Sequence, residues 1–339
     1  MKKKIKWGVI GSGGIALKRT IPEGIIPAAN AELEIVYDIN AQINKKVAEK
    51  FGVYAAQSID ELINSNIDAV YIATPANVHC QQAIACAKAK KHILCEKPLA
   101  LTVEETKKMF QACKKANVNL GTAFMMRFQS QHQAALKMLR KGQIGKPVYA
   151  RAQLSGWYPP IEGAWRQDPK QSGGGALMDM GIHCINLLEM FFGEVKQVSC
   201  FINNTVHNYK SEDSAAVMLC FKNGVIAMID SFFCIPNASS KNILELYGSS
   251  GSIIAKRTLG QGAGKMSEMT AFLENQTCDD GICIKPDNIN MYKAEIEQFS
   301  HAIITKQYSL NDEDAGIRTQ KIIAACYESA KTGKSVKCR

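Results

Sequence analysis

A glycine-rich turn near the N-terminus constrains the fold of this 339-residue chain more than any other feature. Residues 5–10 form a short apolar run, and directly after it the chain reads Gly11-Ser12-Gly13-Gly14-Ile15-Ala16. This spacing matches G-x-G-x-x-G/A, between a strand and a helix. The first glycine permits a tight turn, the second lets the backbone approach a pyrophosphate, and a small final residue allows close helix packing. The pattern predicts a Rossmann fold whose dinucleotide contacts Gly11, Ser12, Gly13, Gly14 and Ile15.

An acidic residue at the end of the next apolar run favours NAD over NADP. Residues 33–37 form a second strand pattern, and Asp38 follows it about 20 residues beyond the glycine turn. A carboxylate there can accept hydrogen bonds from the adenosine ribose hydroxyls and would repel a 2′-phosphate. The next residues, Ile39, Asn40 and Ala41, include no arginine to hold that phosphate. We therefore expect NAD as the cofactor and regard NADP as the weaker candidate.

The first third of the chain alternates strand and helix patterns. The expected strands are residues 5–10, 33–37, 69–73, 92–95 and 118–122, and the expected helices are residues 45–51, 78–89 and 103–116. Strands that alternate with helices at this spacing are typical of a doubly wound parallel sheet with helices on both faces. We assign residues 1–123 to an NAD-binding Rossmann domain of the α/β class.

The pattern changes after about residue 123. A helix (131–141), a strand (147–155) and a helix (176–191) precede extended segments at 195–206, 214–222, 225–233, 243–247 and 252–255. Turn pairs such as Asn223-Gly224 join them, which indicates an open, mostly antiparallel sheet and an α+β domain. We assign residues 124–339 to a substrate-binding and oligomerisation domain. Its last helices, near 292–305 and 312–332, could pack back on the first domain.

Three further blocks carry a family resemblance. They read ATPANVH from Ala73 to His79, CEKP from Cys95 to Pro98, and GGGALMDMGIH from Gly173 to His183. Together they resemble the Gfo/Idh/MocA family, and the resemblance covers nearly the whole chain. It implies a Rossmann domain followed by a domain with an open, mostly antiparallel sheet. It also implies oxidation or reduction of one carbinol carbon of a sugar, sugar derivative or cyclitol.

The residues expected to be catalytic are Lys97, Asp179 and His183. Hydride transfer from a secondary alcohol leaves an oxygen that must lose its proton, so the reaction needs a base beside the nicotinamide. Asp179 and His183 stand four apart in a predicted helix, on one face. Lys97 follows a strand at the carboxyl edge of the parallel sheet, where ligands bind in such folds. The sequence leaves open which of Lys97 and His183 is the base. We favour His183 as the base and Lys97 as its electrostatic partner, while Asp179 orients the imidazole ring or a substrate hydroxyl.

The resemblance also implies further cofactor contacts. In the family, the loop that matches Thr74, Pro75, Asn77 and His79 runs beside the nicotinamide and its ribose. To these we add Glu96 and Lys97. The alternative for the loop is an ordinary helix start in which Asn77 is only the N-cap.

The expected substrate contacts are Lys97, Arg127, Trp165, Arg166, Asp179 and His183. Arginine supplies forked donors and tryptophan a stacking face for a pyranose ring. The Trp-Arg pair resembles the branch of aldose, anhydrofructose and dihydrodiol dehydrogenases, although Asp38 departs from the NADP-using members of that branch. A purely structural role is the alternative for these residues.

Composition argues against several other classes of protein. The formal charge is +10, but the lysines are spread along the chain without a dense basic stripe, so we expect no nucleic-acid partner. No apolar stretch approaches the roughly 20 residues of a membrane helix, and the apolar run after MKKKIKW is too short for a signal peptide. The twelve cysteines follow no CxxC spacing, so we expect reduced thiols, no metal and a cytoplasmic protein. Cys278 and Cys283, in the polar stretch TCDDGIC, are the one pair close enough to consider, and we expect two unrelated thiols.

Two other functions stay open at this stage. One is a glycosidase that uses tightly held NAD for transient oxidation, as some relatives do. The other is a non-catalytic NAD-binding regulator, a class that tends to lose the Lys or His of the site, whereas this chain keeps Lys97 and His183. Because family members bury the open sheet face against a second subunit, we expect a homodimer or homotetramer.

Overall fold

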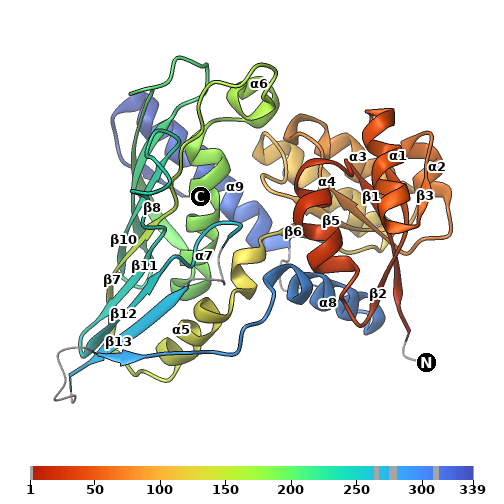
Figure 1. The fold of residues 1–339 in the computed structure, drawn as a ribbon. Helices are drawn as coiled ribbons and strands as arrows, with labels where there is room; N and C mark the ends of the chain where they lie inside the picture. The colour runs from red at the N-terminus through yellow and green to blue at the C-terminus, as the bar shows by residue number, and fades with distance from the viewer. Residues whose placement is uncertain (1–2, 263–266, 275–280, 308–312, 339) are drawn as a thin grey trace. The chain divides into compact units, whose positions relative to one another are not determined.

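The computed structural model describes residues 3–262, 267–274, 281–307 and 313–338. The chain packs as two compact units (Figure 1). The first unit comprises Met1–Met125 and Asn290–Ile317, and the second comprises Met126–Ile289 and Arg318–Arg339. The chain therefore crosses from one unit to the other three times. That the units act as a cofactor domain and a substrate domain stays a prediction.

The sheet of the first unit is parallel throughout, and its described strands run in the order β3-β2-β1-β4-β5-β6. These strands are β1 (Ile5–Ile10), β2 (Ala31–Tyr37), β3 (Tyr54–Ala55), β4 (Ala69–Ile72), β5 (His92–Glu96) and β6 (Leu120–Ala123). This order is that of a Rossmann fold, with the reversal of strand order between β1 and β4. The predicted doubly wound sheet is confirmed. The short β3 was missed because two residues leave no periodic signal.

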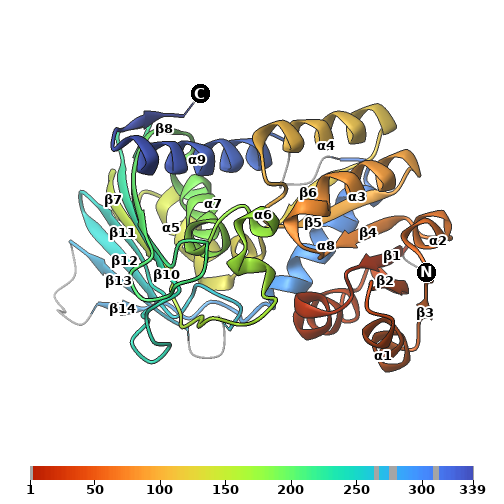
Figure 2. The same ribbon diagram turned by 90° about the horizontal axis from the view of Figure 1, so that it is seen from above.

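Helices cover both faces of this sheet (Figure 2). They are η1 (Ala16–Ile25), α1 (Ala41–Phe51), α2 (Ile59–Asn64), α3 (Ala76–Lys88), α4 (Val103–Ala116) and α8 (Met291–Ile304). One core joins the sheet to α2, α3 and α4 through buried residues such as Leu62, Cys86 and Phe110. The other joins it to η1, α1 and α8 through residues such as Ile21 and Phe299. Both faces of the parallel strands are therefore buried, as a parallel sheet requires.

The helix that follows the glycine turn is wider than an α-helix. Over Ala16–Ile25 it is a π-helix, and the Ile26 N–H donates to the Ile21 carbonyl, five residues back, at 3.0 Å. Pro22 lies inside it and has no N–H to donate, which weakens the α-helical pattern at this point. The predicted helix start is confirmed, but its hydrogen-bond spacing was not foreseeable from the glycine motif.

The second unit contains a larger sheet with the order β14-β13-β12-β11-β7-β10-β9-β8-β15. Its described strands are β7 (Pro147–Gln153), β8 (Val195–Asn203), β9 (Ser214–Phe221), β10 (Ile226–Phe232), β11 (Leu244–Gly248), β12 (Gly251–Lys256), β13 (Glu268–Leu273), β14 (Ile282–Cys283) and β15 (Val336–Lys337). Only β7 and β10 pair in parallel among these strands; the other pairs are antiparallel. The predicted mostly antiparallel sheet is confirmed, and β13, β14 and β15 were not predicted.

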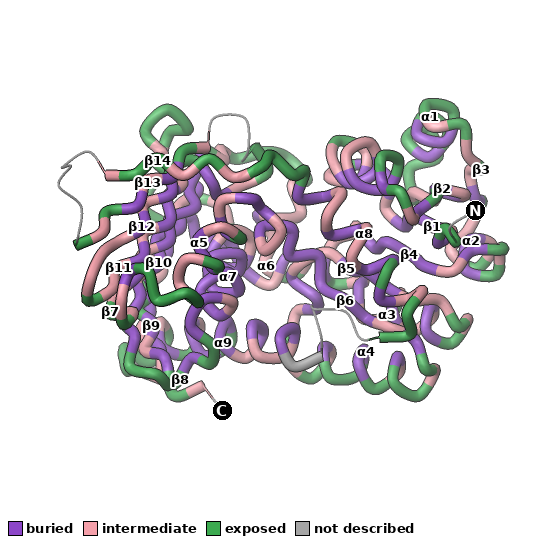
Figure 3. Tube along the Cα trace, turned by 90° about the horizontal axis from the view of Figure 1, so that it is seen from below, coloured by how far each residue is buried: buried purple, intermediate pink, exposed green. Residues whose placement is uncertain are grey.

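One face of this sheet carries the helices of the unit. The helical segments are η2 (Met125–Phe128), α5 (Ser130–Arg140), η3 (Trp165–Gln167), α6 (Pro169–Ser172), η4 (Leu177–Gly181), α7 (Ile182–Phe192) and α9 (Glu313–Thr332), of which α9 belongs to this unit from Arg318 on. Nearly every residue of α7 is buried, and Figure 3 shows the buried residues concentrated in the strands and this helix. Asn186 and Glu189 are buried polar residues within this apolar helix. Buried polar groups need partners, so these two residues point to a specific network.

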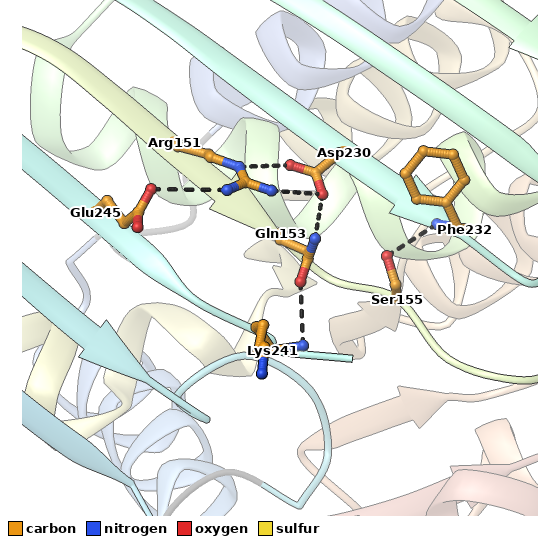
Figure 4. A network of polar contacts seen from close by, with 7 residues as sticks. All are labelled: Arg151, Gln153, Ser155, Asp230, Phe232, Lys241 and Glu245. Atoms are coloured by element: carbon orange, nitrogen blue, oxygen red, sulfur yellow. Dashed lines mark hydrogen bonds and ion pairs between the residues drawn. The ribbon is translucent and has the colours of Figure 1, made fainter. Parts of the chain in front are cut away.

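The other face of the sheet combines apolar side chains with an ion-pair network (Figure 4). Arg151 Nε contacts Asp230 Oδ1 at 2.9 Å, and Arg151 Nη1 lies 4.0 Å from Glu245 Oε2. Gln153 joins the network by donating to Asp230, and its Oε1 accepts the Lys241 N–H at 3.1 Å. These contacts tie β7, β10 and β11 together and fix their register.

Among the described residues, no helix combines the length and the apolar character needed to cross a bilayer. Within the same residues, no group of three or more His, Cys, Asp or Glu side chains could hold a metal ion. Cys283 is an exposed free thiol, and Cys278 lies outside the described residues.

Candidate functional site

The glycine turn lies between β1 and η1 and leaves room for a backbone-bound ligand. Gly11 has φ +79°, and a Cβ on it would lie 2.8 Å from the carbonyl carbon and oxygen of Ala73. Gly14 has φ +49°, and a Cβ there would meet nothing within 4 Å. Ser12 is fully buried, and its Oγ has no hydrogen-bond partner among the described residues. An orphaned hydroxyl beside open glycine backbone fits a pyrophosphate.

Asp38 is held in place by the turn it follows. Its Oδ2 accepts the Gly13 N–H at 3.0 Å, and its Oδ1 accepts the Asn40 N–H at 3.0 Å. A Cβ on Gly13 would lie 3.3 Å from Asp38 Oδ2, so a side chain at this position would crowd the carboxylate. Both carboxylate oxygens keep further lone pairs for ribose hydroxyls. The residues of this turn therefore fit a dinucleotide.

The loop after β4 is fixed to the loop after β5 by a buried imidazole. His79 is 1% exposed; its Nε2 lies 2.8 Å from the Thr74 carbonyl oxygen and its Nδ1 lies 3.0 Å from the Pro98 carbonyl oxygen. Burial lowers the pKa of His79. His79 thus supports both loops with its ring nitrogens turned to protein oxygens. Helix α3 begins at Ala76, so the alternative that Asn77 caps this helix is wrong; Pro75 is the N-cap residue, with extended backbone.

Lys97 directly follows β5, and its backbone is held by the carboxylate before it. The Lys97 N–H donates to Glu96 Oε2 at 3.2 Å, and the Tyr71 hydroxyl donates to Glu96 Oε1. Thr20 Oγ1 in turn donates to the Tyr71 oxygen at 3.0 Å. A chain of side chains from η1 and β4 therefore fixes the residue before Lys97. Neither Tyr71 nor Thr20 was predicted from the sequence; the available signal was a tyrosine hydroxyl inside the apolar strand AVYI.

A second acidic residue lies buried near Glu96. Glu295 on α8 is 3% exposed, and burial, followed by the nearby Glu96 carboxylate, raises its pKa well above the ordinary value. The sequence signal was an acidic residue on a helix face shared with Tyr292, Ile296 and Phe299.

Asp179 and His183 lie on a helix that changes type between them. The predicted α-helix over 176–191 is wrong for its first turns, because Leu177–Gly181 is a π-helix and α7 begins at Ile182. A π turn spans slightly more residues than an α turn, so positions 179 and 183 still fall toward the same side. His183 is 5% exposed and the Asp179 side chain 22%. Such π turns occur often at functional sites.

The structure pairs Asp179 with one of the predicted substrate residues. Arg166 Nε donates to Asp179 Oδ1 at 3.2 Å, and the Arg166 guanidinium lies 4.4 Å from the centre of the Trp165 ring. Tyr158 lies beside the pair: burial raises its pKa, while Arg166 lowers it. The second unit therefore brings four groups together, of which Tyr158 was not predicted.

Arg127 contacts the same helix as His183. Its Nη1 donates to Asn186 Oδ1 at 3.3 Å, and Asn186 follows His183 by three residues on α7. Gln133 donates to the Arg127 carbonyl and so ties η2 to α5. Among the predicted substrate residues of the second unit, Trp165, Arg166 and Asp179 thus lie together, whereas Arg127 contacts Asn186.

Comparisons with known proteins agree with this arrangement. Residues 5–124 match the model of an oxidoreductase family with an NAD-binding Rossmann fold, and residues 132–254 match the GFO/IDH/MocA C-terminal domain. The 1,5-anhydro-D-fructose reductase of Ensifer adhaerens is 29% identical over 97% of both chains. The myo-inositol 2-dehydrogenase of Thermotoga maritima is 33% identical over 73% of this chain and 74% of its own.

A solved structure has the same fold over the full length. The aldose-aldose oxidoreductase of Caulobacter crescentus, complexed with glycerol, superposes with a TM-score of 0.90 at 25% identity, covering 99% of this chain and 100% of the other. The two family models together match residues 5–124 and 132–254, and the fold agrees with them. This chain therefore belongs to the Gfo/Idh/MocA family of oxidoreductases.

Proposed function

We propose that this oxidoreductase transfers a hydride between NAD and one secondary carbinol or keto carbon of a sugar, sugar derivative or cyclitol. The observation that carries the proposal is the carboxyl edge of the parallel sheet. The glycine turn follows β1, Asp38 follows β2, Thr74 lies just beyond β4 and Lys97 follows β5. In open α/β sheets, ligands bind at this edge and at the reversal of strand order.

In the proposed mechanism each residue has a separate task. A bound nicotinamide supplies the hydride acceptor or donor. Lys97 places an ammonium group against the reacting oxygen and stabilises negative charge on it. His183 accepts the hydroxyl proton during oxidation and returns it during reduction, while Asp179 orients His183 or a substrate hydroxyl. Arg127, Trp165 and Arg166 hold the remaining hydroxyls and a ring face of the substrate.

The test of this proposal is an absorbance screen for NADH formation or consumption. The panel contains 1,5-anhydro-D-fructose, D-xylose, myo-inositol, levoglucosan and their keto or alcohol counterparts, each with NAD(H) and NADP(H). We expect net, sugar-dependent turnover with at least one pair. Cleavage of a glycoside without net NADH would instead favour the glycosidase alternative. Dinucleotide binding without any turnover would favour a regulator.

The cofactor preference rests on Asp38. Replacing it by alanine removes the acceptor for ribose hydroxyls and the charge that repels a 2′-phosphate. We expect Asp38→Ala to lower kcat/KM for NAD about tenfold. The ratio of kcat/KM for NAD to kcat/KM for NADP should therefore fall. Asp60→Ala, a change at another acidic residue in the first turn of α2, is the control. If the ratio of kcat/KM for NAD to kcat/KM for NADP were the same in Asp38→Ala and the wild type, our assignment of NAD would be contradicted.

We also propose a homodimer or homotetramer in the cytoplasm, formed through the outer face of the second sheet. Cross-strand pairing puts Met218 beside Met228 on this face, and Tyr149 beside Tyr247. Met218 is 55% exposed, and an apolar sheet face of this kind is typical of a subunit interface. We expect sedimentation of the wild type above monomer mass at micromolar concentration, and of Met218→Glu as a monomer. A monomeric wild type would contradict the proposal.

A further inference from the structure

A chain of hydrogen-bonded side chains crosses the interior of the second unit. Arg127 Nη1 donates to Asn186 Oδ1 at 3.3 Å, and Asn186 Nδ2 donates to Thr319 Oγ1 at 3.2 Å. The Thr319 hydroxyl donates to Glu189 Oε2 at 2.8 Å. Arg318 Nε donates to the other carboxylate oxygen, Glu189 Oε1, at 3.3 Å. The first three bonds point the same way, from the Arg127 guanidinium to the Glu189 carboxylate.

We propose that Glu189 is a positioning residue for the substrate: it sets the direction of this chain and so holds the Arg127 guanidinium in place for a substrate oxygen. The inference rests on the proposed function, in which Arg127 contacts the substrate. It concerns a residue that no motif of the sequence singles out. Glu189 itself does not touch the substrate in this proposal; it acts through Thr319 and Asn186.

The physical reason lies in the amide of Asn186. A carboxylate at Glu189 only accepts hydrogen bonds, so the Thr319 hydroxyl must donate to it. The Thr319 oxygen then accepts from Asn186 Nδ2, which leaves Asn186 Oδ1 turned toward Arg127. If position 189 presents a donor to Thr319, the hydroxyl hydrogen no longer has an acceptor there, and we expect it to turn toward Asn186. The amide then reverses and places its NH2 group against the Arg127 guanidinium, donor against donor.

A neutral group at position 189 is expected to present that donor. Arg318 Nε faces Oε1 and requires an acceptor there, so the proton of a neutral carboxyl falls on the side of Thr319. A glutamine obeys the same constraint, with its oxygen toward Arg318 and its NH2 toward Thr319. Glu189→Gln therefore imitates the protonated carboxyl with almost no change of volume.

Glu189 changes charge within the physiological range. Its side chain is 4% exposed, and burial raises its pKa to about 7, against the opposing influence of Thr319, Arg318 and Arg127. The groups that face it are Arg318 and Thr319 on α9, Arg127 on η2 and the thiol of Cys338 near the C-terminus. The hydrogen-bonded chain should therefore hold the Arg127 guanidinium in place above about pH 7, where Glu189 is ionised, and release it below that pH.

Two kinetic measurements test the inference. With the best sugar of the screen at pH 8, Glu189→Gln should raise KM about tenfold or more, the loss expected for one hydrogen bond to a charged group, and leave kcat within about twofold. The wild-type KM should rise as pH falls through about 7, whereas that of Glu189→Gln should stay flat. Glu194→Gln is the matched control, because Glu194 is an exposed carboxylate paired with Lys222 at 2.6 Å.

A rescue variant separates positioning from a general loss of packing. Asn186→Asp places oxygens toward both Arg127 and Thr319 whatever the state of position 189. The double variant Glu189→Gln/Asn186→Asp should therefore recover the wild-type KM. A KM for Glu189→Gln that matches both the wild type and Glu194→Gln would overturn the inference.

Crystal structures at pH 8 provide a readout that does not depend on turnover. We expect Arg127 to contact Asn186 in the wild type and to be displaced in Glu189→Gln. An unmoved Arg127 in the variant would overturn the inference even if the enzyme is active. A wild type that turns over no sugar would instead refute the proposed function, and the two crystal structures would still decide whether Glu189 positions Arg127.

Discussion

Lys97→Ala and His183→Ala are each expected to lower kcat for the best sugar by about 10³-fold, within the range found when a general acid–base or a charge-stabilising group is removed. Lys97 is fixed through its own N–H by Glu96, which Tyr71 holds from β4. His183 is held on a nearly fully buried helix. Stopped-flow absorbance of NADH measures the chemical step directly.

The two substitutions also test whether the residues act together. If Lys97 and His183 serve one proton-transfer step, the double variant should be little slower than the slower single variant. Lys88→Ala removes an exposed lysine at the end of α3 and is the matched control, with kcat expected within twofold of the wild type. Full turnover by Lys97→Ala or His183→Ala would show that the altered residue has been assigned wrongly. NADH affinity should stay within a few-fold in His183→Ala, since the second unit supplies none of the proposed cofactor contacts.

Gly11→Ala is expected to weaken NADH binding by about 100-fold. A side chain at φ +79° is strained by roughly 1–2 kcal/mol, and the added Cβ lies 2.8 Å from backbone atoms of Ala73. Those atoms lead into the loop of Thr74, so relief of the overlap must move the loop or the turn. Fluorescence titration with NADH measures the loss of affinity.

A second glycine separates steric overlap from backbone strain. Gly52 ends α1 with φ +66°, and a Cβ on it would meet nothing within 4 Å. Gly52→Ala should therefore lower the melting temperature without changing the affinity for NADH. Equal affinity for NADH in Gly11→Ala and the wild type would mean that the dinucleotide does not approach this turn.

Local patterns in the sequence were sufficient for much of the first unit. The strand β1 and the helix α4 begin and end where the apolar periodicity places them, because regular elements with one buried face carry a repeating signal. The glycine spacing and Asp38 predicted a carboxylate beside the turn, and Asp38 does accept the Gly13 N–H. These features depend on neighbours in the chain or on one strand pairing, so the sequence encodes them directly.

Contacts between distant segments explain what was missed. Tyr71 and Glu96 are separated by 25 residues, and Asn186 and Thr319 by 133, so no local period relates them. The π-helical turn before His183 was missed as well, because its sequence fits an α-helix equally well. Residues such as Glu295 and Glu189 were visible only as acidic interruptions of apolar helices.

The sequence by itself determined the Rossmann architecture and the glycine turn with its acidic partner, and it supplied the residues that we propose for the chemistry. Only the tertiary structure decided how those residues are held. Glu96 lies between the Tyr71 hydroxyl and the Lys97 backbone, and Arg127 is linked to Glu189 by a chain of side-chain hydrogen bonds. The physical reason is that a motif fixes residue types and backbone shape over a few positions. The direction of a hydrogen bond and the charge of a buried carboxyl depend on groups that only folding brings together.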